Sequence, residues 1–517
     1  MPEVPGEAPT FDVLEFEVEG NTVLSPLAVE RALLPFMGPG RRLADVEAAR
    51  TALEKAFQDG GWLTVFVDLP EQRIDEGLVR MVVTEGRVDR VRVTGSRYFS
   101  QGRIRAVVNE LQPGRVPNFN TLQTQVGELN RGPARQVQPI LRPGRDAGTV
   151  EAELKVTDQL PIGATVELKN HHAADTEPWR LLVSGRWDNL FQRDHVLSLT
   201  AITAPAEPSQ SRVLVLGYTV PAADNRSWQF TVVASDSTLE PLGAGTVIGR
   251  GTTVSLRHLW QVYRSSSSHT LQAGADYKDL QESIVSGGAE LSTPLRYMPF
   301  TLAHNGQWQH DGRSQTLLNT SFSFAFSPVL SRRIDCPGNV GPVDQFACRR
   351  QGADGGFAVL RSDLRHSRGL LGGTLLLRLA GQIAQQPLAG GEQYNLGGTD
   401  SVRGYFEGEA AGDRALLASA EWRSASLAGE LAGVFAGVAP WLNELNVLAF
   451  IDAGRTVTLQ PLPDQAARVP LMGTGLGLRL RAARLLSAEL ELGWPLKATR
   501  SSPERDPRLH ARVALQF

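Results

Sequence analysis

Apolar and polar residues alternate almost strictly from about residue 162 to residue 517. In residues 487–494 the even-numbered positions are apolar and the odd-numbered positions are polar or glycine, and residues 472–481 follow nearly the same rule. A period of two residues predicts β-strands that each have one apolar face. We count about sixteen such strands, joined alternately by short turns, such as Asp311-Gly312, and by longer loops.

The alternation leaves two architectures open, because a soluble β-sandwich also alternates. Two features favour a membrane barrel. The polar face of neighbouring strands carries both Arg and Glu, as a water-filled lumen would, and an even number of strands with short turns on one side is typical of outer-membrane barrels. We therefore predict an all-β transmembrane barrel of about 16 antiparallel strands over residues 159–517, surrounded by outer-membrane lipid. The side chains expected to line its lumen are Arg378, Gln382, Arg479, Arg481, Glu489, Glu491 and Arg512.

Residues 11–158 mix helical and strand periods and contain an internal repeat. The segment VEGNTVLS at 18–25 reappears as VTGSRYFS at 93–100. In both copies an alternating strand runs into a Gly turn and then a Ser suited to cap a helix. Two helical segments and two strands follow each time. We therefore predict two β-α-α-β-β domains, residues 11–86 and 87–158, after an N-terminal extension at 1–10.

The composition narrows the possible functions. A net charge of -3 over 517 residues gives no sign of a nucleic-acid binder. No run approaches the ~18–20 apolar residues of a membrane helix, which excludes a helical membrane protein. The first residues lack the basic region and apolar core of a signal peptide, so the chain is either cytoplasmic or given in mature form. With no nucleophile elbow, Walker loop or HExxH helix, we expect no enzyme and no cofactor.

Two pairs of residues could bind a metal or form a disulfide. His171 and His172 point to opposite faces of a strand and have no third ligand at suitable spacing, so we expect an extracellular loop and no metal. Cys336 and Cys348 lie close together in a loop rich in Gly, Pro and charge. Such a pair fits a disulfide in an oxidising compartment, with two free thiols as the alternative. We expect this loop to be extracellular as well.

A Gly-rich loop between two predicted strands carries a fixed cation, Arg403, and a later strand carries an anion, Asp452. Apolar residues at 447, 449, 451 and 453 should face lipid, so the residues between them point inward. We predict that a salt bridge between Arg403 and Asp452 pins the loop inside the barrel, where inward glycines at 473, 475 and 477 leave room for it. A solvated loop arginine is the alternative. The residues of this predicted latch are Val402, Arg403, Gly404, Tyr405, Phe450, Asp452 and Gly454.

These features together resemble the two-partner secretion transporters (TpsB proteins) of the POTRA-plus-barrel superfamily. The resemblance covers nearly the whole chain: two POTRA-like repeats, the loop motif 402–405 and the strand motif 450–454. It implies that Arg403 and Asp452 meet in the lumen of an outer-membrane pore with its POTRA domains in the periplasm. The family often has an N-terminal plug helix, but about ten residues precede Phe11 here, three of them proline, which puts plug-dependent gating in doubt.

The resemblance implies export, without ATP, of one large secreted protein, a TpsA-type adhesin, haemolysin or toxin. We expect the unfolded partner to add a strand to an exposed sheet edge of a POTRA domain. The candidate edge residues are Leu63, Val65, Val67, Gln136 and Gln138. A barrel-assembly insertase of the same superfamily, opening the seam between residues 162–170 and 508–517, is the main alternative. A passive porin or ligand-gated receptor would explain the barrel but not the repeats.

Overall fold

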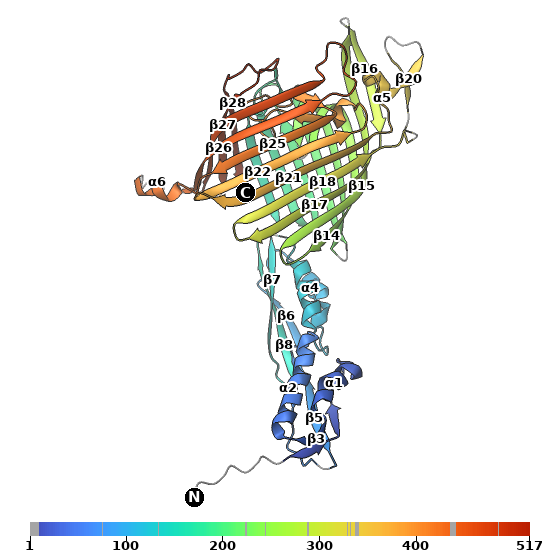
Figure 1. Ribbon diagram of the computed structural model, residues 1–517, viewed down its shortest axis with the longest axis vertical. Helices are drawn as coiled ribbons and strands as arrows, with labels where there is room; N and C mark the ends of the chain where they lie inside the picture. The colour runs from blue at the N-terminus through green and yellow to red at the C-terminus, as the bar shows by residue number, and fades with distance from the viewer. Residues whose placement is uncertain are drawn as a thin grey trace. The chain divides into compact units, whose positions relative to one another are not determined.

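The computed structural model divides into two compact units, one reaching to residue 161 and including 191–193, the other formed by 162–190 and 194–517. It describes residues 10–74, 76–132, 134–222, 225–242, 245–286, 289–327, 329–330, 332–336, 341–434, 441–483 and 485–517 (Figure 1). Apart from residue 10, the predicted N-terminal extension lies outside the described residues. None of the described helices is long and apolar enough to cross a membrane.

The first unit begins with a small domain whose three-stranded sheet has the order β2-β5-β4. Its strand β5 pairs parallel with β2 and antiparallel with β4. The domain also contains a separate two-stranded sheet of β1 and β3, which the sequence pattern did not predict. The elements are β1 (Phe11–Val13), β2 (Glu15–Glu19), α1 (Pro26–Leu33), η1 (Leu34–Phe36), β3 (Gly38–Arg41), α2 (Leu43–Asp59), β4 (Val65–Asp68) and β5 (Leu78–Glu85).

Residues 87–158 repeat this arrangement, with the sheet order β6-β8-β7 and the same parallel and antiparallel pairings. The repeated glycine has one physical reason in both copies. Gly20 and Gly95 have φ of 87° and 78°, and an added Cβ would lie 2.3 Å from the carbonyl oxygen of Val83 or Val156. The elements are β6 (Arg87–Thr94), α3 (Gln101–Val107), η2 (Asn109–Leu111), α4 (Phe119–Leu129), β7 (Arg135–Pro143) and β8 (Thr149–Asp158).

The second unit is a closed antiparallel barrel, as predicted. Residues 278–286 of β15 pair with β16, and residues 267–275 of β15 pair with β17. Strands β16 and β17 therefore occupy one strand position of the barrel, which is interrupted at Met298-Pro299. Counted in this way the barrel has sixteen strands. Its elements are β9 (Ile162–Lys169), β10 (Arg180–Leu190), β11 (His195–Thr203), β12 (Ser211–Ala222), β13 (Arg226–Leu242), β14 (Gly245–Tyr263), β15 (Ser267–Ser286), β16 (Ala289–Tyr297), β17 (Phe300–Asp311), β18 (Ser314–Phe324), β21 (Ala358–Leu370), β22 (Gly373–Ala384), β25 (Arg414–Arg423), β26 (Leu442–Val457), β27 (Arg468–Ala482), β28 (Leu486–Pro495) and β29 (Arg508–Gln516).

Main-chain pairing between β29 and β9 closes the barrel, from Arg512 opposite Lys169 to Gln516 opposite Thr165. Large apolar side chains on alternate positions of the strands are exposed on the outside, among them Leu199, Phe230, Leu256 and Leu302. The residues between them therefore face the lumen.

Connections alternate between the side at which β9 begins, here called the entry side, and the opposite, far side. The entry side has short turns, with one exception that corrects the expected pattern. The β25–β26 connection, residues 424–441, contains the helix α6 (Ala428–Val434). Its first residues continue the antiparallel pairing of β25 with β26, since the Ser424 and Leu427 N–H groups donate to the carbonyls of Val447 and Leu445. Main-chain bonds of this kind stabilise a long connection on the side where short turns were expected.

Candidate functional site

The connection between β22 and β25, residues 385–413, is the candidate functional element. It contains η3 (Gly390–Glu392) and an antiparallel ribbon of β23 (Tyr394–Leu396) and β24 (Ala410–Gly412). We call residues 397–409 the loop tip. Gly397 and Gly398 have φ of 107° and 94°, and an added Cβ on Gly398 would lie 2.1 Å from the Glu407 carboxylate. Glycine is therefore needed for the chain to reverse here.

Arg403, at the loop tip, is buried against the lumen side of β26. Its Nε donates to Asp452 Oδ2 at 2.8 Å, its Nη2 donates to Oδ1 at 3.0 Å, and its main-chain N–H donates to Oδ2 at 3.1 Å. Asp452 is 0% exposed. Two parallel side-chain bonds to one carboxylate fix both the position and the orientation of the guanidinium. The structure thus brings together the two charges that the sequence analysis paired.

Further carboxylates extend this pair into a cluster. Arg403 Nη1 donates to Glu421 at 2.6 Å and lies 3.5 Å from Glu491. Arg423 lies 2.9 Å from Glu421, and Arg479 lies 3.4 Å from Glu491. Three cations therefore meet three carboxylates, counting Asp452, and the buried charges compensate one another.

Glu421 was missed by the sequence analysis, and Glu491 was assigned to the lumen lining alone. Glu421 lies on β25 directly opposite Phe450, whose ring lies 3.6 Å from the Arg403 guanidinium. The available signal was a lone charged residue in the segment 415–422, which is apolar apart from one serine. A single charge on an alternating strand identifies an inward position but no partner.

Glycines on β27 and β28 form the surface on which the loop tip lies. A Cβ on Gly473 would lie 2.0 Å from the Arg403 carbonyl oxygen, and one on Gly493 would lie 2.6 Å from the Gly404 nitrogen. The Gly404 N–H donates to His510 Nε2 at 3.1 Å. The main chain of the loop tip therefore contacts the barrel wall directly. Inward-facing glycines make this contact possible, because they have no side chain to keep the two backbones apart.

Apolar contacts and one hydroxyl fix the remaining predicted latch residues. Val402 and Tyr405 are both 0% exposed and belong to one apolar cluster with Leu396. A Cβ on Gly454 would meet Val402 at 3.0 Å. Tyr405 donates from its hydroxyl to the carbonyls of Met472 and Lys497.

Most predicted lumen residues form ion pairs on the same side of the lumen. Arg378 lies 2.7 Å from Asp363, and Arg512 lies 2.7 Å from Glu167 and 3.5 Å from Glu489. This side of the lumen, formed by β21 to β29 and β9, is charged but internally paired.

One lumen prediction needs correction. Gln382 is 1% exposed and donates to the carbonyls of Glu392 and Asp413, so it is covered by the root of the loop and does not line an open lumen. Alternation assigned it to the correct face, but it contains no information on what covers that face. The side chain of Arg481 is 74% exposed near the entry-side end of β27, and its place in the lumen lining stays a prediction.

The predicted recognition segments lie at sheet edges, because β4 and β7 are the outer strands of their sheets. On β4 the side chains of Val65 and Val67 are buried and Phe66 is exposed, as is Leu63 just before the strand. The side chains of Gln136 and Gln138 on β7 are also exposed.

The edge of β7 is occupied at its centre, however. The Asn130 amide accepts from the Val137 N–H at 2.6 Å and donates to the Val137 carbonyl at 2.9 Å. Pro139 on the same strand has no N–H to offer. A partner strand would therefore find few main-chain groups here, which disfavours binding at Gln136 and Gln138.

A second buried junction, at Asp413, ties the root of the loop to its neighbours. The Asp413 carboxylate accepts from both Nη atoms of Arg350 at 2.5 and 2.6 Å, and from the N–H groups of Leu388 and Leu459. One carboxylate thus joins the β18–β21, β22–β25 and β26–β27 connections on the far side.

Replacing Asp413 with alanine is expected to loosen all three connections, because the partly buried Arg350 guanidinium would lose its counter-ion and two N–H groups would lose their acceptor, at a cost of about 1–3 kcal/mol. Limited proteolysis of the protein in outer membranes should show faster cleavage within residues 385–413. Asp464→Ala, at an exposed position of the β26–β27 connection, is the matched control. Equal cleavage rates for the two variants would contradict this role.

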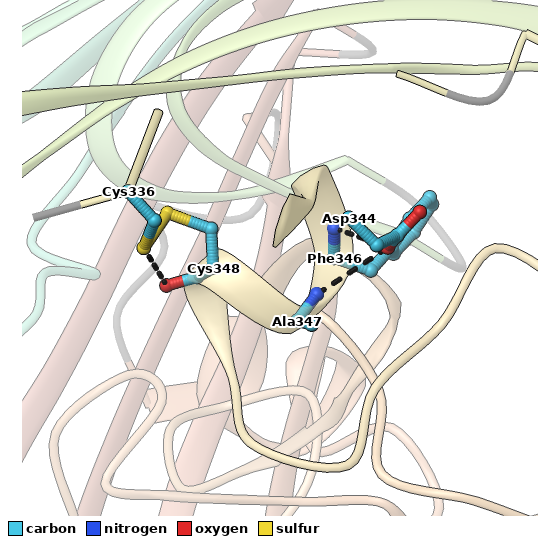
Figure 2. Close-up of a disulfide and its surroundings, with 5 residues drawn as sticks. All are labelled: Cys336, Asp344, Phe346, Ala347 and Cys348. Carbon is cyan, nitrogen blue, oxygen red and sulfur yellow. Dashed lines mark hydrogen bonds between the residues drawn. A yellow bond between two sulfur atoms is a disulfide. The ribbon is translucent and has the colours of Figure 1, made fainter. Parts of the chain in front are cut away.

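Cys336 and Cys348 form a disulfide across the β18–β21 connection (Figure 2). The closed segment includes β20 (Pro342–Asp344) and the short helix α5 (Gln345–Arg349), which Asp344 caps by accepting from the Phe346 N–H at 2.8 Å. Strand β20 pairs with β19 (Arg333–Asp335). Residues 337–340 lie outside the described residues.

His171 and His172, in the β9–β10 connection, contact the loop tip. His171 Nδ1 lies 3.0 Å from Thr399 Oγ1, and the His172 carbonyl accepts from the Glu407 N–H at 3.0 Å. Within the described part of the chain, no group of three or more His, Cys, Asp or Glu residues is arranged to hold a metal ion.

Two family models match the chain on the parts described above. Residues 11–86 match the POTRA domain of ShlB type. Residues 345–480, which include the loop and β26, match the haemolysin secretion/activation protein ShlB/FhaC/HecB. The chain belongs to the TpsB family of outer-membrane transporters. In this family the POTRA domain lies in the periplasm, so the entry side of the barrel is periplasmic.

Curated relatives agree with this family, one over most of the chain and one over part of it. The chain is 22% identical over 498 residues to the outer membrane transporter CdiB of Dickeya dadantii (strain 3937), covering 95% of this chain and 84% of the relative. It is 25% identical over 241 residues to CdiB of Escherichia coli O6:K15:H31 (strain 536 / UPEC), covering 43% and 41%.

Solved structures share the fold. CdiB from Escherichia coli has a TM-score of 0.69 at 20% identity, covering 100% of this chain and 93% of that structure. BamA from Haemophilus ducreyi lacking POTRA domains 1–3 has a TM-score of 0.56 at 13% identity, covering 98% and 100%.

Proposed function

We propose that this TpsB transporter takes up an unfolded partner protein in the periplasm and exports it through the barrel without ATP. The observation that carries the proposal is the loop tip held inside a closed barrel that follows a POTRA domain in one chain. The partner would be a large secreted protein of the adhesin, haemolysin or toxin type. Folding of the emerging chain outside the cell would prevent its return and so supply the direction of transport.

The N-terminal unit is proposed to recognise the partner. Residues 87–158 repeat the strand order and the positive-φ glycine of the matched POTRA domain, which supports a second POTRA domain here. Between the two candidate edges, β4 is favoured because Asn130 occupies the centre of β7. Strand addition at β4 would have to displace two longer contacts, from the Val65 N–H to the Trp62 carbonyl at 3.4 Å and from Arg50 to the Val67 carbonyl at 3.3 Å. Leu63 and Phe66 would offer exposed apolar contacts.

The double substitution Leu63→Ser with Phe66→Ser is expected to lower export about tenfold, because two exposed apolar contacts with the partner contribute on the order of 1.4 kcal/mol. Secreted partner would be measured at matched outer-membrane levels of the transporter. The matched control is Gln136→Ser with Gln138→Ser on β7, which should leave export unchanged. The reverse result would move the recognition site to β7.

Co-expression in a Gram-negative host tests the proposed function itself. The large exoprotein encoded beside this chain should reach the medium or the cell surface when the chain is present and remain in the periplasm when it is absent. Secretion that does not depend on this chain, together with loss of other barrels when it is depleted in its own host, would replace the exporter with an insertase. An insertase would have to open the β29–β9 seam, which is closed in this structure by paired main chains.

A further inference from the structure

One connection on the entry side differs in chemistry from the turns around it. Residues 424–441 join β25 to β26 and contain a single charged residue, Glu430. By contrast, the turn after β14 is Arg264-Ser265-Ser266 and the turn after β17 is Gly312-Arg313. A contiguous apolar segment at the surface of a protein usually marks a contact with a partner or with a membrane. The helix α6 lies in this segment.

The start of α6 is fixed to the barrel. The Ser426 hydroxyl oxygen accepts from the Leu445 N–H at 3.2 Å and from the Ala428 N–H at 3.3 Å, which joins the first turn of the helix to β26. Ala428 is 8% exposed, whereas Gly429 and Glu430 are fully at the surface. From there α6 extends sideways, outside the outline of the barrel (Figure 1). The helix therefore lies beside the barrel and does not cover its lumen.

Large apolar residues fall on one face of this helix. Leu427, Leu431 and Val434 are spaced by four and then three residues, which places them within about 60° of one another around a helix. Gly429 and Gly433 lie on the opposite face. A helix of seven residues is marginal in water on its own. It therefore needs a surface against which its apolar face can pack.

The base of α6 lies at the edge of the lipid-facing surface. Trp422 on β25 pairs with Ala449, an outward position of β26, and its indole N–H donates to the Leu370 carbonyl at 3.1 Å. In the same turn Leu371 is 83% exposed, and Trp441, just before β26, is 64% exposed. Tryptophan is enriched where the hydrocarbon of a membrane meets its headgroups. The apolar outer face of the barrel thus continues onto this part of the entry side.

We propose that α6 lies in the periplasmic leaflet of the outer membrane, with its large apolar residues toward the acyl chains of phospholipids. Helices at such an interface bury their apolar face about 5–10 Å into the boundary between headgroups and acyl chains. Residues 424–441 contain no Lys or Arg, so burial of apolar surface holds the helix there, not attraction to anionic headgroups. Because β25 and β26 carry Glu421 and Asp452, α6 fixes the membrane depth of the two strands to which Arg403 bonds.

Spin labels in the full-length protein, reconstituted in vesicles of phosphatidylethanolamine and phosphatidylglycerol, test this position. The chain contains two cysteines, which are bonded to each other, so one added cysteine is the single free thiol. Leu431→Cys places the label on the apolar face. Gly429→Cys places it on the opposite face, where an added Cβ would meet no atom within 4 Å. Leu302→Cys on the outside of β17 and Asp464→Cys on the far side are the references for lipid and for water.

The measurement compares collisions of each label with oxygen, which dissolves in acyl chains, and with a water-soluble nickel chelate. The ratio of oxygen to nickel collisions at 431 is expected to be close to that at 302 and to exceed that at 464 about tenfold, which corresponds to about 1.4 kcal/mol. The ratio at 429 should be lower than at 431. Migration of unheated samples in gels, which differs between folded and unfolded barrels, shows that each labelled variant has folded.

Two other results would overturn the proposal. Frequent nickel collisions at both 429 and 431 would place α6 in water. Few collisions with either reagent at 431 would show that the helix packs against protein, either the N-terminal unit or a second copy of the chain. None of these results depends on export, so the position of α6 and the proposed function are tested separately.

Discussion

Replacing Arg403 with alanine is expected to abolish export while leaving the barrel in the membrane. The substitution removes the cation from a site where Asp452 is fully buried and where Glu421 and Glu491 lie close by. Leaving a buried carboxylate without its partner costs about 3–5 kcal/mol. The barrel strands have their own main-chain pairing, so we expect the loop tip to leave its position and the strands to remain closed.

Export of the co-expressed exoprotein at matched outer-membrane levels is the measurement for this variant. Arg481→Ala removes a similar charge from an exposed position of β27 and should export normally. Arg403→Lys keeps the charge but loses the two parallel bonds, so an intermediate level is expected. Full export by Arg403→Ala would show that the buried cluster is not needed for function.

Replacing Gly473 with valine should produce the same loss by a different cause. A Cβ at this position would lie 2.0 Å from the Arg403 carbonyl oxygen. This clash can be relieved only if the main chain of the loop tip moves away from β27. The substituted residue remains on a β-strand, where valine is well tolerated. The expected result is loss of export and new cleavage by trypsin after Arg403 in intact cells.

A second glycine provides the control for the valine substitution. Gly185 on β10 lies opposite Leu199, an outward-facing residue, and a Cβ there would meet no atom within 4 Å. Gly185→Val should therefore export at the level of the unsubstituted chain. If both variants export equally, the close contact between the loop tip and β27 does not hold the loop.

The barrel and the latch could be predicted because both depend on local order in the chain. Strand alternation assigns each residue to a face, so Asp452 and the glycines at 473 and 475 were expected to point inward before any contact was known. The loop cation was then the evident partner for the one anion in the later motif. Neither step required knowledge of which strands are neighbours.

The rest of the site depends on contacts between distant segments. Glu421 joins Arg403 because β25 lies beside β26, and Gln382 is covered because the root of the loop folds over it. Asn130 blocks β7 through two side-chain bonds that no periodicity reveals. Alternation gave the correct face for Gln382, but in all three cases the fold determined what the residue contacts.

The interruption of one strand position at Met298-Pro299 has a consequence for the outer rim of the barrel. On the far side of this point, β16 pairs with β15. The next strand of the barrel, β18, pairs with β17, which lies on the entry side of the interruption. The amide of Gln345, at the start of α5, takes the place of a neighbouring strand there by accepting from the Arg296 N–H at 2.9 Å and donating to its carbonyl at 2.7 Å. Phe346 packs against Tyr297 beside it. The disulfide-closed segment therefore protects an edge that could otherwise pair with the strand of another molecule at the cell surface.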